Sequence, residues 1–413
     1  MDRTYAGTAG LVGKSLEKVN RRMLQRGNRR GAVLGVRALN RALLERQLLL
    51  RRSKMPAFDA IEHLVGLQAQ VPNSPYIGLW TRLAGFALDD LTDLITKRRV
   101  VRLPLMRSTI HMVTARDCLT LRPLTQPVQN RGLEGSFGRR LKGIQIDAVA
   151  AAGRSLVEAQ PRTFSELGAA LRKRWPERDP AALAYAVRAV VPLVQVPPRG
   201  IWGNSAPAAH TTVDAWLHRP LAKKVSLEKL VMRYLSAFGP ATVRDVQAWS
   251  GLTQLREVID RLRRRLRVFR NEDGQELFDV PDGPRPHPDT PAPPRFLPEF
   301  DNVLLAHADR TRVIADEHRR LVFTSGGLLL GTFLIDGFVR GRWRIVREPA
   351  RTRATLDLYP IERLSAGERQ AATEEGDRLL AFAAADATAR DVRVLTSPPS
   401  KSAEARSSGS RRR

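Results

Sequence analysis

A chain of 413 residues, 43% of them hydrophobic, can bury more than one core, which excludes disorder over its whole length. Its 69 Lys and Arg exceed its 42 Asp and Glu by 27; Met1–Arg30 and Lys401–Arg413 carry net charges of +6 and +4, so +17 belongs to the remainder. Because such an excess concentrates polyanions, and no basic amphipathic helix stands apart to bind a membrane, we expect double-stranded DNA as the partner, contacted mainly at its phosphates.

The predicted elements begin after residues 1–32, which we expect to form a flexible basic arm. Residues 33–145 make a first unit, whose helices follow from three apolar stripes: Leu39 and Leu43; Phe58, Ile61, Leu64 and Val65; Leu91 and Leu94. The segment Arg102–Val113 is then typical of a β-strand. Helices followed by a β-segment predict a first winged helix, which is a helix-turn-helix with a β-hairpin wing.

A second unit, residues 146–222, repeats this order. Thr163–Glu166 is a capping box at the start of one helix, and Asp179-Pro180 begins the next helix. The wing is predicted from two strands and the tip between them, which are Val194–Val196, Gly200–Trp202 and Pro197–Arg199.

A third unit, residues 223–290, shows the order most clearly. Its three helices are predicted over Leu227–Phe238, from Thr242 to Gly251, and from about Thr253 onward. Two β-rich runs, Arg267–Arg270 and Gln275–Val280, follow and are joined around Asp273-Gly274, a strong hairpin signal.

A Pro-rich linker, Pro281–Pro298, leads into residues 291–395, a β-rich region with a helix. Its predicted elements are strands within Gly327–Arg347 with turns at Gly337 and Gly341, a strand Ala354–Tyr359, and a helix Ser365–Ala384. Residues 396–413 should form a disordered basic tail. The predicted fold class is therefore α+β and predominantly helical, with three tandem winged helices before the β-rich element.

The last helix of the third unit carries Arg256, Arg261 and Arg264. In a helix-turn-helix the second helix enters the major groove, so these arginines are candidate DNA-binding residues. An ordinary solvated surface of long side chains is the alternative, and phosphate contacts alone would give no sequence specificity.

Cys118 is the single cysteine, which excludes an intrachain disulfide and a Cys-based zinc site and indicates a reducing cytoplasm. With DNA as the expected partner, we expect the protein to be associated with the nucleoid. The most apolar run, Gly326–Val339, is too short to span a bilayer and contains Asp336. We expect a monomer without metal or cofactor.

Gln68 and Gln70 follow an apolar helix and precede Val71-Pro72, where proline disfavours helix. In extended backbone, residues two apart point the same way, so both amides are expected to reach one small ligand or water. A neutral amide is a poor base, but it can hold a water or place partial negative charge beside a developing cation. Such chemistry suffices only for a leaving group that departs easily. The spacing alone favours the alternative, two ordinary polar residues at the end of a helix.

Five blocks surround or follow this pair: Leu39–Leu44, Leu64–Pro72, Pro75–Leu83, Met106–Val113, and Phe296–Leu305 with Asp309-Arg310. On these blocks the chain resembles the AlkZ-like DNA glycosylases, also called YcaQ-like or winged-helix alkylpurine glycosylases, from about Val36 to about Ala384. The resemblance implies three winged helices packed into a C-shaped DNA-binding body. It also implies a monofunctional glycosylase that releases N7- or N3-alkylated purines and, in some members, unhooks interstrand crosslinks.

The resemblance maps the family's catalytic Gln-x-Gln pair onto Gln68 and Gln70. Within the other blocks, Arg107 is a candidate partner for a phosphate or a buried carboxylate, and His111 and Asp301 are candidates to line the cleft. The commoner alternatives are a structural histidine on a strand, and a carboxylate that bonds a helix cap or an arginine. Two other functions stay open: a non-catalytic winged-helix DNA binder or transcription regulator, and a basic structural protein whose charge only follows genome composition.

Overall fold

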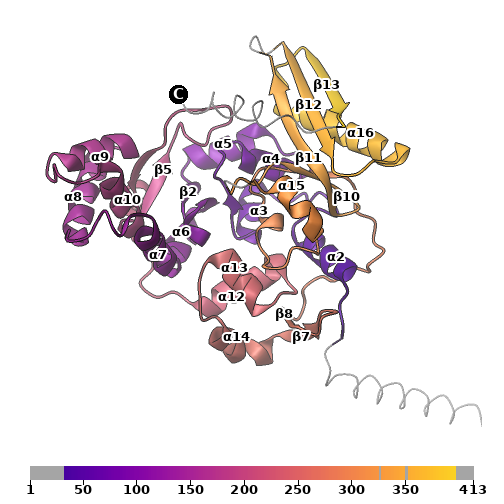
Figure 1. Cartoon of the computed structure of the whole chain (residues 1–413), viewed down its shortest axis with the longest axis horizontal. Coiled ribbons are helices and arrows are strands. Elements are labelled where there is room, and N and C mark those ends of the chain that lie inside the picture. The colour runs from indigo at the N-terminus through magenta and orange to yellow at the C-terminus, as the bar shows by residue number, and fades with distance from the viewer. Residues whose placement is uncertain (1–31, 325–326, 349–351, 397–413) are drawn as a thin grey trace, which may run out of the picture.

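The computed structural model describes residues 32–324, 327–348 and 352–396, so almost all of the predicted arm and tail lie outside the described residues. Figure 1 shows mixed helices and sheets in three lobes around a central group of helices and strands. Helices α7–α10 form one lobe, α12–α14 with β7 and β8 a second, and a sheet with α16 a third. No helix among the described residues is both long and apolar enough to cross a bilayer. The α+β class is confirmed.

The first unit contains more elements than predicted. They are α2 (Val36–Arg46), α3 (Ala57–His63), β1 (Leu67–Gln68), α4 (Ser74–Trp80), α5 (Leu88–Thr96), β2 (Val100–Pro104), β3 (Ile110–Thr114), α6 (Ala115–Leu124) and α7 (Gln126–Phe137). The prediction of one strand over Arg102–Val113 is wrong, because a 3₁₀ turn at Met106–Ser108 reverses the chain between β2 and β3. Arg107 and Ser108 occupy the left-handed region there, with φ of 55° and 58°.

The second unit contains α8 (Ile146–Ala159), β4 (Arg162–Thr163), α9 (Phe164–Arg172), α10 (Pro180–Val190), β5 (Leu193–Val196), β6 (Ala209–Thr212) and α11 (Val213–Leu217). The capping box of Thr163 and Glu166 is confirmed at the start of α9. Gly200–Trp202 is not a strand, so that prediction is wrong. Pro197 and Pro198 lack amide hydrogens for a ladder and Gly200 has a φ of 98°, so the chain turns and β5 pairs with β6 instead.

The hairpins of the first two units join into one sheet. Its six strands lie in the order β1-β3-β2-β5-β6-β4, and Arg102 in β2 pairs with Gln195 in β5. The loop between β5 and β6 returns to the first unit, where the Trp202 amide donates to the Tyr76 hydroxyl over 3.2 Å and the two rings meet edge-on. Residues 197–203 therefore brace α4 and do not form a free wing tip.

The third unit follows the predicted order. It contains α12 (Leu227–Phe238), α13 (Val243–Ser250), α14 (Arg256–Leu262), a 3₁₀ turn (Arg263–Arg265), β7 (Arg267–Arg270) and β8 (Glu276–Asp279). Thr242 and Asp245 form a capping box before α13, and Gly251 ends that helix at a φ of 77°. Residues of α12 and α13, among them Tyr234 and Trp249, share one buried core with α2, β2 and β3.

The C-terminal region is a five-stranded sheet in the order β13-β12-β11-β10-β9, packed against α16. It contains β9 (Arg295–Leu297), 3₁₀ turns (Asn302–Leu304 and Asp316–His318), α15 (Arg319–Val322), β10 (Thr332–Ile335), β11 (Phe338–Arg347), β12 (Arg353–Pro360), α16 (Ala366–Ala383) and β13 (Ala389–Val394). Gly337 lies at the predicted turn, but Gly341 lies inside β11, where a side chain would collide with Phe333. The predicted Pro-rich linker also ends in strand β9, which pairs with β10.

Candidate functional site

The path of the chain into Gln68 depends on a tight turn after α3. Val65 has a φ of 55° and Gly66 a φ of 89°, and a Cβ on Gly66 would lie 2.5 Å from a methyl carbon of Val113. Glycine therefore fits both the conformation and the space. The turn delivers β1 to the edge of the sheet, where Gln68 faces His111 across an antiparallel pair with β3. The extended backbone expected at Gln68 is confirmed.

Gln68 is buried, with 6% of its surface exposed, and its side chain is fixed by Arg107. The Arg107 guanidinium donates to Gln68 Oε1 over 2.6 Å and also donates to the backbone carbonyl of Trp249. Arg107 thereby connects the catalytic candidate to helix α13 of the third unit. Both partners are neutral oxygens, so the predicted pairing with a buried carboxylate is wrong, and the predicted contact with a phosphate stays a prediction.

Gln70 lies in a different environment from Gln68. It is exposed, and its Oε1 accepts a hydrogen bond of 3.2 Å from the Ile110 amide. Between the two glutamines, the Ala69 amide donates to the Ile110 carbonyl and the Ala69 carbonyl accepts from Arg102, each over 2.8 Å. The β2–β3 hairpin and its turn therefore hold both glutamine side chains, one inside the protein and one at its surface.

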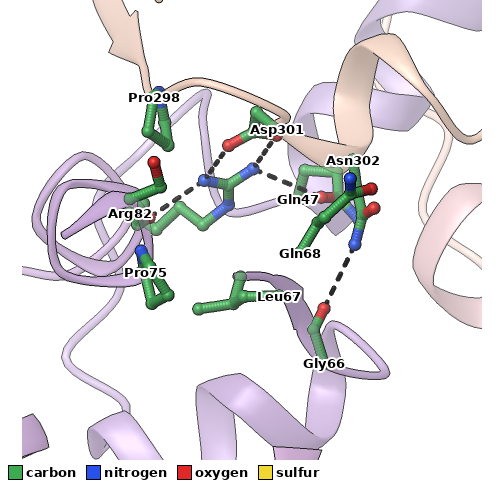
Figure 2. Close-up of a pocket in the computed structure, with 11 residues that line it drawn as sticks. Gln47, Gly66, Leu67, Gln68, Pro75, Arg82, Pro298, Asp301 and Asn302 are labelled. Carbon is green, nitrogen blue, oxygen red and sulfur yellow. Dashed lines mark hydrogen bonds and ion pairs between the residues drawn. The ribbon is translucent and has the colours of Figure 1, made fainter. Parts of the chain in front are cut away.

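A small cavity of about 10 Å³ lies beside Gln68, which is about the space that one water molecule needs. Figure 2 shows Arg82 and Asp301 at this cavity, joined by two parallel hydrogen bonds of 2.9 and 2.8 Å. Both side chains are almost fully buried. Asp301 lines this small cavity together with Gln68, and its bonds to Arg82 and to the Val303 amide match the structural alternative, a carboxylate that bonds an arginine and a helix cap. Gln70 does not line the cavity, so the two amides do not meet in one small pocket.

Asn302 ties the segment that follows β9 to the turn before Gln68. Its Nδ2 donates to the Gly66 carbonyl over 3.3 Å (Figure 2). Its buried Oδ1 has no hydrogen-bond partner among the described residues. The Arg82–Asp301 and Asn302–Gly66 contacts join residues more than 200 positions apart. Sequence reasoning placed Arg82 and Asn302 within resembling blocks but assigned them no role, and no local pattern signals such distant contacts.

His111 lies buried inside the sheet, which matches the structural alternative and not a place in an open cleft. Its side chain has no exposed surface, and Nδ1 bonds to the Thr109 carbonyl over 3.0 Å. Burial, and then the charge of Arg107, lower the pKa of His111 to about 3. The imidazole is therefore neutral at physiological pH and is not a proton donor for catalysis there.

Arg107 keeps its charge despite its surroundings. Burial, and then the nearby charge of Arg310, lower its pKa to about 10, which leaves the guanidinium protonated at neutral pH. A cation beside Gln68 polarises the amide and fixes its oxygen. It also leaves positive charge close to the candidate site that no carboxylate of the described residues neutralises.

The arginines predicted on the DNA-binding helix are exposed at α14 and its C-terminal end. Arg261 donates to Glu228 over 2.7 Å, and Arg256 lies 4.0 Å from Glu276. Arg264 makes no ion pair with a described residue. These positions are open to a partner, and exposed ion pairs of this kind are weak enough to exchange for a phosphate.

The chain is similar to known proteins. The model of a family described as DNA glycosylase AlkZ-like matches residues 61–382, more than three quarters of the chain. The chain belongs to the AlkZ-like DNA glycosylase family. With this membership it belongs to an enzyme class, the hydrolases of N-glycosidic bonds in DNA.

Two relatives from Streptomyces sahachiroi support the assignment. A protein named interstrand DNA cross-link repair glycosylase is 25% identical over 333 residues, in a match that covers 73% of this chain and 86% of that protein. The solved structure of the DNA glycosylase AlkZ has a TM-score of 0.72 with 20% identity, and covers 88% of this chain and 100% of its own. The second likeness shows that the fold is shared.

Proposed function

We propose that this protein is a monofunctional glycosylase that hydrolyses the N-glycosidic bond of N7- or N3-alkylated purines in duplex DNA. The observation that carries the proposal is the Gln68–Gln70 pair, held by Arg107 and the Ile110 amide of one hairpin. The name of the relative that repairs interstrand crosslinks supports a further substrate, a crosslink that joins two alkylated purines.

The chemistry asks little of the protein, because an N7-alkylated purine is already cationic. The bond between the sugar C1′ and the base breaks, its electron pair leaves with the base, and the sugar becomes oxocarbenium-like. The oxygen of a water then forms a bond to C1′, and the water's proton passes to solvent. The protein must place this water and stabilise the positive sugar by electrostatic contacts.

Gln68 and Gln70 can divide these tasks. A carbonyl oxygen has two lone pairs, and each Oε1 accepts one hydrogen bond in the free protein, so each retains one lone pair. We assign the water to exposed Gln70, because its oxygen is within reach of solvent. We assign the stabilisation of the sugar to Gln68, whose oxygen lies deeper and in a medium of lower dielectric constant.

The three helix-and-hairpin units, 33–145, 146–222 and 223–290, are proposed to act as winged helices that hold the duplex, with the protein as a monomer in the cytoplasm near the nucleoid. The exposed Arg256, Arg261 and Arg264 would contact phosphates of the DNA. Reversal of these charges should weaken binding to all sequences alike.

The deciding experiment incubates the protein with a duplex that carries a single N7-methylguanine and measures abasic sites by cleavage with alkali. Release of the base by wild-type protein is expected. Tight binding to one sequence with no release would favour the non-catalytic DNA binder. A DNA affinity that does not depend on salt concentration would favour a structural protein whose positive charge does not bind a polyanion.

A further inference from the structure

Arg310 lies in the segment between the 3₁₀ turns Asn302–Leu304 and Asp316–His318, and its environment is unusual for a half-buried cation. Its guanidinium stacks over the ring of Phe323, 4.7 Å from the centroid. Its Nε is buried without a hydrogen-bond partner, and the side chain forms no ion pair with a described residue. The neighbouring Asp309 directs a carboxylate oxygen to the Thr311 amide over 2.9 Å.

The buried arginines Arg46 and Arg82 are matched by carboxylates, whereas buried Arg102 and Arg122 form no ion pair with a described residue and donate to neutral oxygens instead. Arg46 lies 2.6 Å from Asp279, and Arg82 lies 2.8 Å from Asp301. Arg310 has neither kind of partner among the described residues. The charges that act on Arg310 are instead positive, because burial and then Arg319 lower its pKa, and its own charge lowers that of Arg107. Withdrawing a cation from water without a counterion is costly, so this site favours an anion.

The anion has a place to bind. An open pocket of about 480 Å³ is lined by Arg310, Asp316, Arg319, Arg320 and Phe323. Its one carboxylate, Asp316, accepts from Arg319 over 3.2 Å, so these two charges offset each other. Arg310 and the exposed Arg320 form no ion pair with a described residue and keep their charges for a ligand.

We propose that this pocket binds a phosphodiester group of the DNA strand that carries the damaged base, with Arg310 as its principal ligand. The planar guanidinium presents paired donors that match phosphate oxygens, and the Phe323 ring holds its plane. The assignment to DNA rests on the proposed function and on two observations: the charge of Arg310 acts on Arg107, and Arg107 donates to Gln68. Free inorganic phosphate shares the chemistry but lacks this connection to the site.

The bound phosphate would do more than add affinity. Arg107 and Arg310 place two positive charges near a sugar that must itself become positive, which opposes the reaction. A phosphate on Arg310 offsets one of these charges only when DNA is in place. Binding and catalysis are thereby linked through the same arginine.

The test compares Arg310→Gln with Arg310→Lys, and uses Arg369→Gln as the matched control, because Arg369 is an exposed arginine of α16. Affinity for a duplex with a tetrahydrofuran abasic analogue is measured over a series of salt concentrations. Loss of a charge-assisted contact should weaken binding by Arg310→Gln about tenfold and reduce the slope of log K against log salt by about one. Arg310→Lys should keep the wild-type slope, and Arg369→Gln should match wild type.

Thermal unfolding establishes that the variants are folded, and Arg310→Lys tests the charge even if Arg310→Gln is unstable. An unchanged slope in folded Arg310→Gln overturns the proposal. A second result would also overturn the proposal. If Arg310→Gln keeps the wild-type salt slope but binds the N7-methylguanine duplex and the abasic duplex with equal affinity, the pocket holds the base. If sodium phosphate raises the melting temperature of wild type, compared with chloride at equal ionic strength, and the DNA slope does not depend on Arg310, the site takes free phosphate only. None of these binding measurements requires base release, so failure of the proposed glycosylase activity is recognised separately.

Discussion

Gln68 has an arginine on either side, and only one of the two arginines is paired with a carboxylate. Arg82, at the small cavity, faces the carboxylate of Asp301 in a two-point ion pair and also donates to the Gly78 carbonyl. Arg107, on the hairpin side, donates to the neutral oxygens of Gln68 and Trp249. The charge that acts on it is the positive charge of Arg310, which lowers the pKa of Arg107 after burial has lowered it. One arginine is neutralised inside the protein and the other is not.

The difference separates a structural task from a functional one. The Arg82–Asp301 pair joins the residues just after α4 to the segment after β9, and the adjacent Asn302 of that segment donates to the Gly66 carbonyl in the turn before Gln68. Arg107 costs the protein stability, because a half-buried charge without a carboxylate is poorly solvated. Such a cost is understandable where the charge fixes the oxygen of a catalytic group and awaits an anionic substrate.

The largest effect is expected from a substitution that breaks the Arg82–Asp301 ion pair. Asp301→Ala leaves Arg82 buried without its carboxylate and removes the cap of the 3₁₀ turn at Val303, so the free energy of unfolding should fall by about 3–5 kcal/mol. Urea unfolding measures this change. The double variant Arg82→Met with Asp301→Leu should lose less than Asp301→Ala alone, since it leaves no unpaired charge. Equal losses in the two variants would mean that packing, and not charge pairing, holds this contact.

The second effect concerns the glutamines. Gln70→Ala should slow release of N7-methylguanine by a factor on the order of 10², the scale of losing one positioned polar group. Gln68→Ala should slow it similarly, and should also reduce stability by about 1–3 kcal/mol because Arg107 loses a buried acceptor.

Exposed Gln70 provides the cleaner measurement, since its replacement should leave the urea midpoint unchanged. Single-turnover rates on the N7-methylguanine duplex separate the chemical step from product release. Rates equal to wild type in both folded variants would place the active site elsewhere.

A third effect tests the arginine that is not neutralised. Arg107→Met should lower the single-turnover rate about tenfold by releasing Gln68 Oε1 from its charge-assisted bond. Because Arg107 acts through Gln68, affinity for an abasic duplex should change much less than the rate. A loss confined to affinity would make Arg107 a DNA ligand and not a positioning residue.

A contrast between local and long-range interactions also explains how much of the fold could be predicted from the sequence. The third unit was predicted almost element by element because its signals are local: the cap at Thr242, the stop at Gly251 and the turn at Asp273-Gly274. The turn between β2 and β3 was missed because Arg107 and Ser108 adopt positive φ without being glycine.

The candidate site also contains one part with a local sequence signal and another part without one. The glutamine pair could be proposed from a short motif and its resemblance to a family. The Arg82–Asp301 contact spans 219 residues, and the unneutralised state of Arg107 depends on what packs around it in three dimensions. Neither feature can be predicted from the spacing of residues along the sequence.

The smallest effect is a dependence on pH that should not involve catalysis. Buried His111 has a pKa of about 3 in the folded chain, against about 6.5 for an unperturbed histidine. Between these values the unfolded chain binds a proton that the folded chain does not, so stability is lost as the pH falls below 6.5. From pH 7.5 to pH 5.0, His111 should account for about 2 kcal/mol of that loss.

His111→Gln isolates this contribution, because buried His210 and His307 also have lowered pKa values and remain in the variant. The loss between pH 7.5 and pH 5.0, measured by urea unfolding, should be smaller in His111→Gln than in wild type by that amount. In Arg107→Met the charge that helps to lower the His111 pKa is gone, so the loss should again be smaller, though by less. Equal losses in wild type and His111→Gln would show that His111 titrates alike in the folded and unfolded chains, and that the charge of Arg107 is better screened than its surroundings indicate.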